Sequence, residues 1–561
     1  MKLFDKIKEK RAAKQEVDNE KAFVDGVYSL FEEYRSAYAS EWERLETCER
    51  MYRSDHWYGV EKKDKNEPQP VTPIIQSTIE NVHADLMDNI PEAIIQPEGP
   101  EDERVARVVE ALIKQNHDAA SYAKEYWLLA HDLLTCGYMV QETGYDTKLN
   151  RGLGGAFIRH VDTRNIMFDP QVTDAQDSRA VIKYASKPVR WMEQHYPEYA
   201  GQFKADTTSG YTAQDGTVKR DDLKNILLLE YWWREYDTEA KRYKVHMCKV
   251  GGGKLLEDSR KEKPDGYFAH GEYPFKVTPL YVRKGSCLGY GIVDMFIQQQ
   301  KYSDKLDQIV MKNALMASRV KMLVRADAGD IEDLRDWSKE VHEVTNLEGI
   351  KWFSTPSLPS YIMQYIQQIR QSIKDESGAN DFSRGTTSGG VTAASAVAAL
   401  QEMSGKRSRM ATRQMHEAFK EAVRQEIEVE REFNILPREV MLTTNGQRER
   451  ETFDTAMLQR KTALGNEVPM EFLVSIKVQK ENRWAVMAHN ELMIQMLQLG
   501  ALQPMQALEL MQFEGKESVL AKQQQQPQMS PEQQQAQQAQ AAQQEMAAQL
   551  EQIPSPEMAL G

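Results

Sequence analysis

The sequence has few of the residues from which cross-links and metal sites are built. Its 561 residues include only four cysteines and 11 histidines. The cysteines are dispersed at Cys48, Cys136, Cys248 and Cys287, and no two of them form a C-x-x-C pair. We therefore expect reduced structural thiols rather than a disulfide framework or a zinc site, and we expect no cofactor.

Long hydrophobic runs are also missing. The most apolar stretch, Ile226–Leu229, is followed by Glu230 and is far shorter than the roughly 20 residues that span a bilayer. The basic N-terminal segment, residues 1–15, lacks the apolar core of a signal peptide. We therefore expect synthesis in a reducing cytoplasm and no membrane partner.

An excess of positive charge is absent as well. Lys and Arg total 71 against 85 for Asp and Glu, which gives a formal charge of -14. This balance excludes a basic surface over the whole chain that grips DNA through many phosphate contacts. A hydrophobic fraction of 41% is nevertheless ample for folded cores.

No enzymatic motif is complete. The segment Val250–Lys254 (VGGGK) lacks the spacing of a phosphate-binding loop, and we expect it to form a hairpin turn. Gly289-x-Gly291 lacks the third glycine of a dinucleotide site, and the His342-Glu343 and His416-Glu417 pairs lack the second histidine of a zinc protease. The sequence therefore predicts a protein that is not an enzyme.

Hydrophobic periodicity predicts an α+β chain that is predominantly helical. Residues 1–20 are expected to form a frayed helix or a mobile arm, and residues 523–561, rich in Gln and Ala, a disordered tail. Helices are expected at residues 21–52, 72–90, 101–136 (one or two), 189–199, 292–319, 331–343, 360–377, 392–433, 484–499 and 503–512. Strands are expected at residues 93–96, 138–145, 156–161, 166–168, 180–185, 226–234, 243–250, 321–325, 350–353 and 472–478.

The order of elements after residue 289 is unusual. A long helix leads to a compact α/β unit, a returning helix, a loop rich in Gly, Ser and Thr at residues 380–390, and a very long helix. Two helices that leave and re-enter a body form a projecting hairpin. A single copy buries only one face of each helix, so a ring of copies would bury the remaining faces.

Several short motifs occur in an order that resembles the portal proteins (head–tail connectors) of tailed bacteriophages. The resemblance covers residues 20–520. The motifs are Met51-Tyr52 with Trp57-Tyr58-Gly59, then Asn66, Pro70 and Pro73-Ile74, Asn165–Pro170 (NIMFDP), Gly289-Tyr290-Gly291, Gly389–Ala396 (GGVTAASA) and Gly500-Ala501-Leu502-x-Pro504.

The resemblance implies a wing, stem, clip and crown architecture in a ring oligomer. The regions would be residues 1–20 (arm), 21–288 (wing), 289–319 (first stem helix), 320–356 (clip), 357–379 (second stem helix), 380–390 (tunnel loop), 391–480 (long wing helix and return strand), 481–522 (crown) and 523–561 (tail). The crown is short compared with that of the larger family members.

The resemblance also implies a function and a set of partners. Twelve copies would form the DNA channel at one capsid vertex of the virion, assembled in the host cytoplasm, for viral DNA packaging and genome ejection. The implied partners are double-stranded DNA, the large terminase subunit, major capsid or scaffolding protein, and neck adaptor or tail proteins. The alternatives are a cytoplasmic helical scaffold or adaptor without a channel, and a packaging ATPase or nuclease.

Three sets of residues are candidate contacts. The tunnel loop would face DNA through Phe382, Ser383, Arg384, Gly385, Thr386, Thr387 and Ser388, although a plain linker between helices fits the same composition. The cationic run Lys406, Arg407, Arg409 and Arg413 fits DNA contact, a solvated face, or pairing between subunits with Glu421, Glu426 and Glu428. In the clip, motor and adaptor docking would use Asp327, Asp330, Asp333 and Trp337, in an acidic cluster that also fits a solvated face or a hard cation.

Overall fold

The computed structural model of the chain divides into two units. One comprises residues 1–442 and 450–480, and the other comprises residues 443–449 and 481–561. The structure describes residues 2–62, 67–88, 90–97, 99, 102–203, 225–318, 321–336, 338–353, 358–377, 406–434, 436–444, 447–461, 467–478, 483–500, 502–511, 513 and 516.

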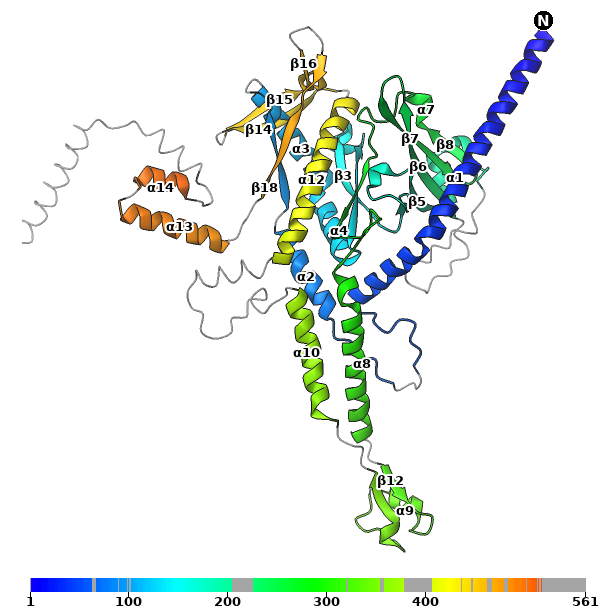
Figure 1. The fold of residues 1–561 in the computed structure, drawn as a ribbon, viewed down its shortest axis with the longest axis vertical. Coiled ribbons are helices and arrows are strands. Elements are labelled where there is room, and N and C mark those ends of the chain that lie inside the picture. Colours follow the sequence, from blue (N-terminus) through cyan, green and yellow to red (C-terminus); the bar gives the residue numbers. More distant parts are fainter. Residues whose placement is uncertain are drawn as a thin grey trace, which may run out of the picture. The chain divides into compact units, whose positions relative to one another are not determined.

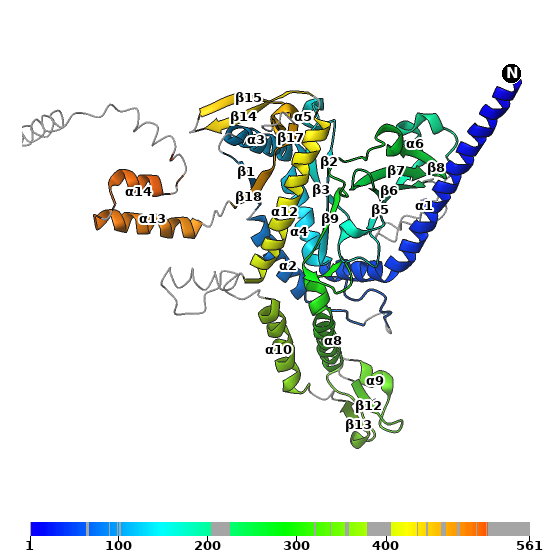
Figure 2. The ribbon, with the colours of Figure 1, turned by 45° about the horizontal axis from the view of Figure 1, so that its top comes forward.

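The first element, α1 (Lys2–Tyr52), is one continuous helix, so no break separates the expected arm from the helix that follows. Its buried residues, among them Val27, Phe31, Tyr34 and Tyr38, recur at three- and four-residue steps. They join one hydrophobic cluster with a five-stranded antiparallel sheet, and Figures 1 and 2 show α1 lying along that sheet. In spatial order its strands are β4 (Ile166–Met167), β5 (Ala180–Pro188), β6 (Asn225–Asp237), β7 (Arg242–Gly251) and β8 (Lys254–Asp258).

A second hydrophobic cluster lies where helices surround a three-stranded sheet. The sheet has the order β3 (Ala156–Val161), β2 (Tyr138–Tyr145) and β9 (Phe275–Pro279), all antiparallel. The helices α3 (Glu103–Ala120), α4 (Tyr122–Thr135) and α12 (Lys406–Phe433) pack against this sheet, and α2 (Ile74–Met87) contacts α4 and α12. The short helices α5 (Leu149–Gly152), α6 (Val189–His195) and α7 (Ser259–Glu262) lie in the connections between strands.

A buried ion pair fixes the C-terminal end of α12. Arg438 Nη2 donates to Glu430 Oε2 at 2.5 Å, and both side chains are almost fully buried. The other carboxylate oxygen of Glu430 accepts hydrogen bonds from Asn116 Nδ2 and from the backbone N–H of Ala156, each at 2.7 Å. Because this carboxylate is satisfied on both oxygens, the pair is a specific joint between α12, α3 and β3.

Two strands that are far apart in the sequence pair with each other in the first unit. The strand β18 (Phe472–Val478) pairs antiparallel with β1 (Pro91–Pro97) over their full lengths, from Pro91 opposite Val478 to Pro97 opposite Phe472. Smaller two-stranded ladders are β10 (Tyr281–Val282) with β11 (Gly289–Tyr290), β14 (Arg438–Thr444) with β15 (Gln447–Phe453), and β16 (Gln459–Lys461) with β17 (Glu467–Pro469).

Two helices and the residues between them project from this body, and we call residues 292–377 the limb. Figure 1 shows α8 (Ile292–Ser318) and α10 (Ser360–Ser377) side by side, with β12 (Lys321–Val324) and α9 (Ile331–Arg335) beyond them. The strand β12 pairs antiparallel with β13 (Ile350–Phe353). The predicted helix at 331–343 was wrong in length, because Asp336 ends α9 in an extended conformation.

The second unit contains the helices α13 (Arg483–Gln498) and α14 (Pro504–Leu510), which contact each other. The Nε2 of His489 lies 3.1 Å from the carbonyl oxygen of Leu510. Gln503 and Gln506 form a capping box at the start of α14. Both helices confirm the sequence prediction for this region.

Most of the predicted strands and helices are confirmed. The VGGGK segment is the hairpin turn between β7 and β8, as expected, with Gly252 and Gly253 at positive φ. The strands β8 to β11 and β14 to β17 were not predicted, and His342 lies in a loop rather than on a helix. Residues 392–405 of the expected long helix lie outside the described residues.

The cysteine prediction is also confirmed, since all four thiols are free and buried. Within the described part of the chain, no helix has the length and apolar character needed to cross a membrane. The same residues contain no group of three or more side chains arranged to hold a metal ion.

Candidate functional site

The limb is seated in the body by the first turns of α8, and farther along this helix Gln308 Nε2 donates to the carbonyl oxygen of Pro68 at 2.9 Å and Lys312 pairs with Glu67. Ile292, Val293 and Phe296 of α8 are buried in the second hydrophobic cluster, followed by Gln300, Ser303 and Asp304. Beyond Asp304, α8 contacts α10, whose Ile366 and Ile373 are buried. Farther along α8, every residue from position 314 to 318 is exposed. One chain therefore leaves most of the limb surface uncovered.

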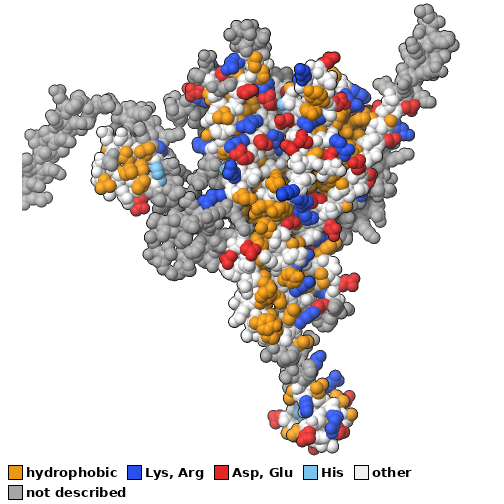
Figure 3. All heavy atoms as spheres, in the orientation of Figure 1, with side chains coloured by type: hydrophobic (Ala, Val, Ile, Leu, Met, Phe, Trp, Pro, Cys, Tyr) orange, Lys and Arg blue, Asp and Glu red, His pale blue; other side chains and the backbone are white. Residues whose placement is uncertain are grey.

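An apolar stripe with a seven-residue period runs along the uncovered side of α8. Met295, Tyr302, Ile309 and Met316 are 40%, 60%, 49% and 57% exposed. Figure 3 shows hydrophobic side chains gathered along the limb below the body. Side chains seven apart lie on one face of a helix, and a seven-residue apolar repeat is typical of a seam with another helix. We call these four residues the α8 stripe.

The second helix of the limb also presents exposed apolar side chains. Tyr361, Met363 and Tyr365 of α10 are 66%, 49% and 53% exposed. A soluble helix pair normally places such residues in its core. The limb therefore has uncovered apolar surface on both of its helices.

Three glycines allow the start of α8 to approach the body closely. Gly137 has a φ of +87°, and a Cβ atom there would lie 2.1 Å from the carbonyl carbon of Tyr290. A Cβ at Gly291 would lie 2.9 Å from the Cα of Gly137. One at Gly289 would lie 2.6 Å from the carbonyl oxygen of Gly137. The Gly-x-Gly segment is therefore required by backbone packing against the turn between α4 and β2.

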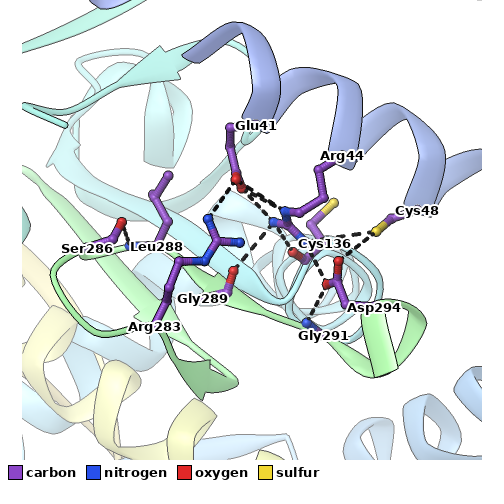
Figure 4. A network of polar contacts seen from close by, with 10 residues as sticks. All are labelled: Glu41, Arg44, Cys48, Cys136, Arg283, Ser286, Leu288, Gly289, Gly291 and Asp294. Carbon is purple, nitrogen blue, oxygen red and sulfur yellow. Dashed lines mark hydrogen bonds and ion pairs between the residues drawn. The ribbon is translucent and has the colours of Figure 1, made fainter. Parts of the chain in front are cut away.

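An ion-pair network joins α1 to the first turn of α8 (Figure 4). Arg44 of α1 binds Asp294 of α8 through Nη1 and Glu41 through Nη2, each at 2.6 Å. Arg44 Nη2 also donates to the carbonyl oxygen of Cys136 at 2.9 Å, and Arg283 Nη1 donates to Glu41 Oε2 at 3.0 Å. The same network includes the helix start, because the Gly291 N–H donates to Asp294 Oδ2 at 2.8 Å.

The shifts in pKa of two groups in this network reflect their burial and their ion pairs. Burial alone would lower the pKa of the Arg44 guanidinium, but Glu41 and Asp294 outweigh burial and raise it. Burial, with the nearby charge of Asp294, raises the pKa of the Cys48 thiol to about 12. This thiol is therefore inert at neutral pH and acts in packing.

A second network ties the two limb helices to each other and to the body. Arg370 of α10 binds Asp307 of α8, with Nη2 2.6 Å from Oδ2. The hydroxyl of Thr72, just before α2, donates to the same oxygen at 3.0 Å. Gln300 Nε2 donates to the carbonyl oxygen of Thr72 at 2.6 Å. Three segments that are distant in sequence thus meet at one point.

The acidic cluster between β12 and β13 forms local pairs. Asp327 makes a two-pronged pair with Arg325 at 2.5 and 2.6 Å, which lowers its pKa. Asp330 caps α9 by accepting from the Glu332 N–H at 3.0 Å. Asp333 binds Lys339, which lowers the pKa of this carboxyl. These contacts fit a solvated acidic face, and Trp337 lies outside the described residues.

The other candidate contacts are placed only in part. Arg409 and Arg413 are exposed on α12, whereas the side chains of Lys406 and Arg407 are not described. The glutamates expected as their partners bind other groups in the same chain: Glu421 binds Lys276 at 3.2 Å, Glu426 binds His117 at 2.8 Å, and Glu428 binds Arg431. The tunnel-loop residues, from Phe382 to Ser388, lie outside the described residues.

Neither network at the root of the limb was predictable from a motif in the sequence. Their members are separated by as many as 298 positions, from Thr72 to Arg370. One local signal was present, because Asp294 stands three residues after Gly291, where a carboxylate caps the start of a helix. The arginine that binds this aspartate carried no signal.

A comparison with protein families identifies a match over most of the chain. The family model for the phage P22-like portal protein matches residues 28–559, nearly the whole chain. A search of curated proteins finds no match. The matched range includes the body, both helices of the limb and the segment between them.

Proposed function

Since the chain belongs to the family of P22-like phage portal proteins, we propose that its limb is the part through which copies join into a ring. As a family member, the chain is a subunit of the phage head–tail connector, a structural component of the capsid vertex that serves DNA packaging. An enzymatic role or a scaffold without a channel is not favoured by this membership.

The observation that supports the ring most directly is the exposed α8 stripe. Each contact in a ring of identical copies is heterologous, so it needs two different surfaces on one chain. The limb offers the α8 stripe (Met295, Tyr302, Ile309 and Met316) and the exposed aromatic residues of α10. In the proposed ring, the stripe of one copy packs against α10 of the next copy, and twelve copies close the ring.

The regions of the ring follow the family architecture. In this proposal residues 21–288 and 391–480 form the wing, residues 289–319 and 357–379 form the stem, and residues 320–356 form the clip. Residues 380–390 form the tunnel loop, and residues 481–522 form the crown. The arm (1–20) and the tail (523–561) are outside these regions.

The partners are assigned to the same regions. Double-stranded DNA passes through the channel past the tunnel loop (Phe382, Ser383, Arg384, Gly385, Thr386, Thr387 and Ser388), where small residues and a net negative chain do not hold phosphate. The large terminase subunit, and later neck adaptor and tail proteins, dock on the clip through Asp327, Asp330, Asp333 and Trp337. Major capsid or scaffolding protein is a further partner, and assembly takes place in the host cytoplasm.

Electron microscopy of the purified protein in negative stain tests this proposal. Closed rings with a central hole are expected. Filaments or single copies would contradict the ring and favour the scaffold. Steady hydrolysis of ATP by the pure protein would contradict a purely structural role.

A further inference from the structure

A short segment between α1 and α2 lies along α8, and we call its residues 67–72 the strap. Gln300 Nε2 donates to the carbonyl oxygen of Thr72 at 2.6 Å, and the backbone N–H of Thr72 donates to Asp304 Oδ1 at 3.3 Å. The hydroxyl of Thr72 donates to Asp307 Oδ2 at 3.0 Å. The Thr72 end of the strap is therefore bound to successive turns of α8.

The other end of the strap is bound farther out on the same helix. Gln308 Nε2 donates to the carbonyl oxygen of Pro68 at 2.9 Å, and Lys312 pairs with Glu67, whose side chain is only 11% exposed. From Gln300 to Lys312 these contacts extend over about 18 Å of α8. None of the bound positions belongs to the α8 stripe, so the strap holds the helix and leaves the stripe uncovered.

The strap is also held on its other side, by the residues that follow α1. The indole N–H of Trp57 donates to the carbonyl oxygen of Pro70 at 2.8 Å, and Gln69 Nε2 donates to the carbonyl oxygen of Val60 at 3.3 Å. The rings of Pro68 and Pro70 fix φ at these positions and so limit the conformations that the segment adopts. The strap is therefore a stiff connection between the body and α8.

The same connection fixes α10 relative to α8. Arg370 Nη2 of α10 donates to the hydroxyl oxygen of Thr72 at 3.2 Å and pairs with Asp307 of α8 at 2.6 Å. The α8 stripe and the exposed aromatic residues of α10 are the two surfaces that meet between copies in the proposed ring. The strap thus lies at the junction that sets the angle between these surfaces.

A small change of angle at this junction is enough to change the number of copies in a ring. In a ring of about twelve copies, neighbours are related by a rotation of about 30°, and one copy more or fewer changes this rotation by about 2° to 3°. A tilt of that size about the start of α8 moves Lys312 by roughly 1 Å. Hydrogen-bond distances vary over only about 0.5 Å, so an intact strap resists such a tilt.

We propose that the strap selects the number of copies at which the ring closes, and that Trp57 and Lys312 are positioning residues for this closure. The inference rests on the proposed ring. With the strap bound, α8 and α10 keep one angle, so rings of a single copy number form. With the strap detached, the same surfaces still associate, but over a range of angles, and rings of neighbouring copy numbers form together.

Native mass spectrometry of full-length variants tests the strap from the side of α8. Lys312→Glu places a second carboxylate beside Glu67 and should detach this end of the strap. We expect several closed species that differ by 64.4 kDa, in place of the single wild-type species. Glu67→Lys combined with Lys312→Glu restores the ion pair with its charges exchanged and should return a single species. A contact between Lys312 and a neighbouring copy would not be restored by the change at Glu67, so this rescue assigns the effect to the strap.

A second variant tests the strap without any change on α8. Trp57→Phe keeps an aromatic ring and removes the N–H that binds Pro70, so it should also give rings of more than one copy number. Because it removes only one hydrogen bond, the additional species should form a smaller share than in Lys312→Glu. Trp191→Phe on α6 is the matched control and should give the single wild-type species. Circular dichroism checks that each variant keeps its fold.

The outcomes separate the strap from the ring. The proposal is overturned if Lys312→Glu and Trp57→Phe give the same single species as the wild type, or if the wild type already gives a mixture. It is also overturned if the exchanged pair keeps the mixture, or if both variants are insoluble or remain single copies, because the ring contacts must survive loss of the strap. A wild type that forms no ring contradicts the ring proposal itself.

Discussion

Replacing Tyr302 by glutamate is expected to abolish assembly and leave the fold of each copy intact. This side chain is 60% exposed in the single chain, at the centre of the α8 stripe. A tyrosine side chain buries on the order of 200 Å² when fully covered, so roughly 120 Å² remains for a neighbour to cover. At about 25 cal/mol per Å² this burial is worth about 3 kcal/mol at each interface, or roughly a hundredfold in affinity.

Size-exclusion chromatography with light scattering measures the outcome, and circular dichroism checks the fold. We expect Tyr302→Glu to elute as single copies with the helical signal of the wild type, and Tyr302→Phe to form rings because it keeps the apolar area. Gln194→Glu adds the same charge at an exposed position on α6 in the body and should also form rings. Normal rings from Tyr302→Glu would refute the role of the α8 stripe.

Three further changes test other parts of the account. Burial alone would lower the pKa of His160, but its contact with Asp132 at 2.8 Å outweighs burial and raises it. His160→Gln should therefore lower the free energy of unfolding by roughly 1 to 2 kcal/mol at pH values below the pKa of His160 in the unfolded state. This difference between variant and wild type should vanish as the pH rises through the pKa of His160 in the folded state. A difference that is the same at every pH, measured by thermal unfolding, would contradict this. Gly137→Ala should give insoluble protein or lower the free energy of unfolding by more than about 4 kcal/mol. Gly26→Ala, at a position with open space around it, should leave the stability unchanged or raise it. If both variants are expressed as soluble protein in equal amounts, the close packing around Gly137 is contradicted. Deletion of residues 386–389 should leave rings intact and impair packaging or retention of DNA in an assembly assay, and loss of the rings would contradict the tunnel-loop proposal.

The elements of this fold were largely predictable because their signals are local. The spacing of Phe31, Tyr34 and Tyr38 marks the buried side of α1, and the β-branched and aromatic residues of β6 mark a strand. The short strands β10 and β11 have only two residues each, which is too few for a periodic signal. The helix α9 is shorter than expected because the backbone at Asp336 is extended. The spacing of hydrophobic residues gives no information about such a local change in backbone conformation.

The joints at the root of the limb were not predictable, because each depends on partners from distant parts of the chain. Arg44 and Asp294 are separated by 250 positions, and His56 and Asp304 by 248. In a sequence, charged residues of this kind are expected on the surface, and only the fold shows that they pair with each other at partly or fully buried positions. The exposed α8 stripe is the opposite case, since its apolar residues read as core and yet face outward in one chain.

The mass of the native assembly shows whether the copies join through the limb into a closed ring. Native mass spectrometry of the full-length protein should give one closed species whose mass is an integer multiple of 64.4 kDa, twelvefold in the proposed ring. A protein that stays folded at 64.4 kDa at high concentration, with its apolar stripe exposed to water, would contradict lateral association through the limb.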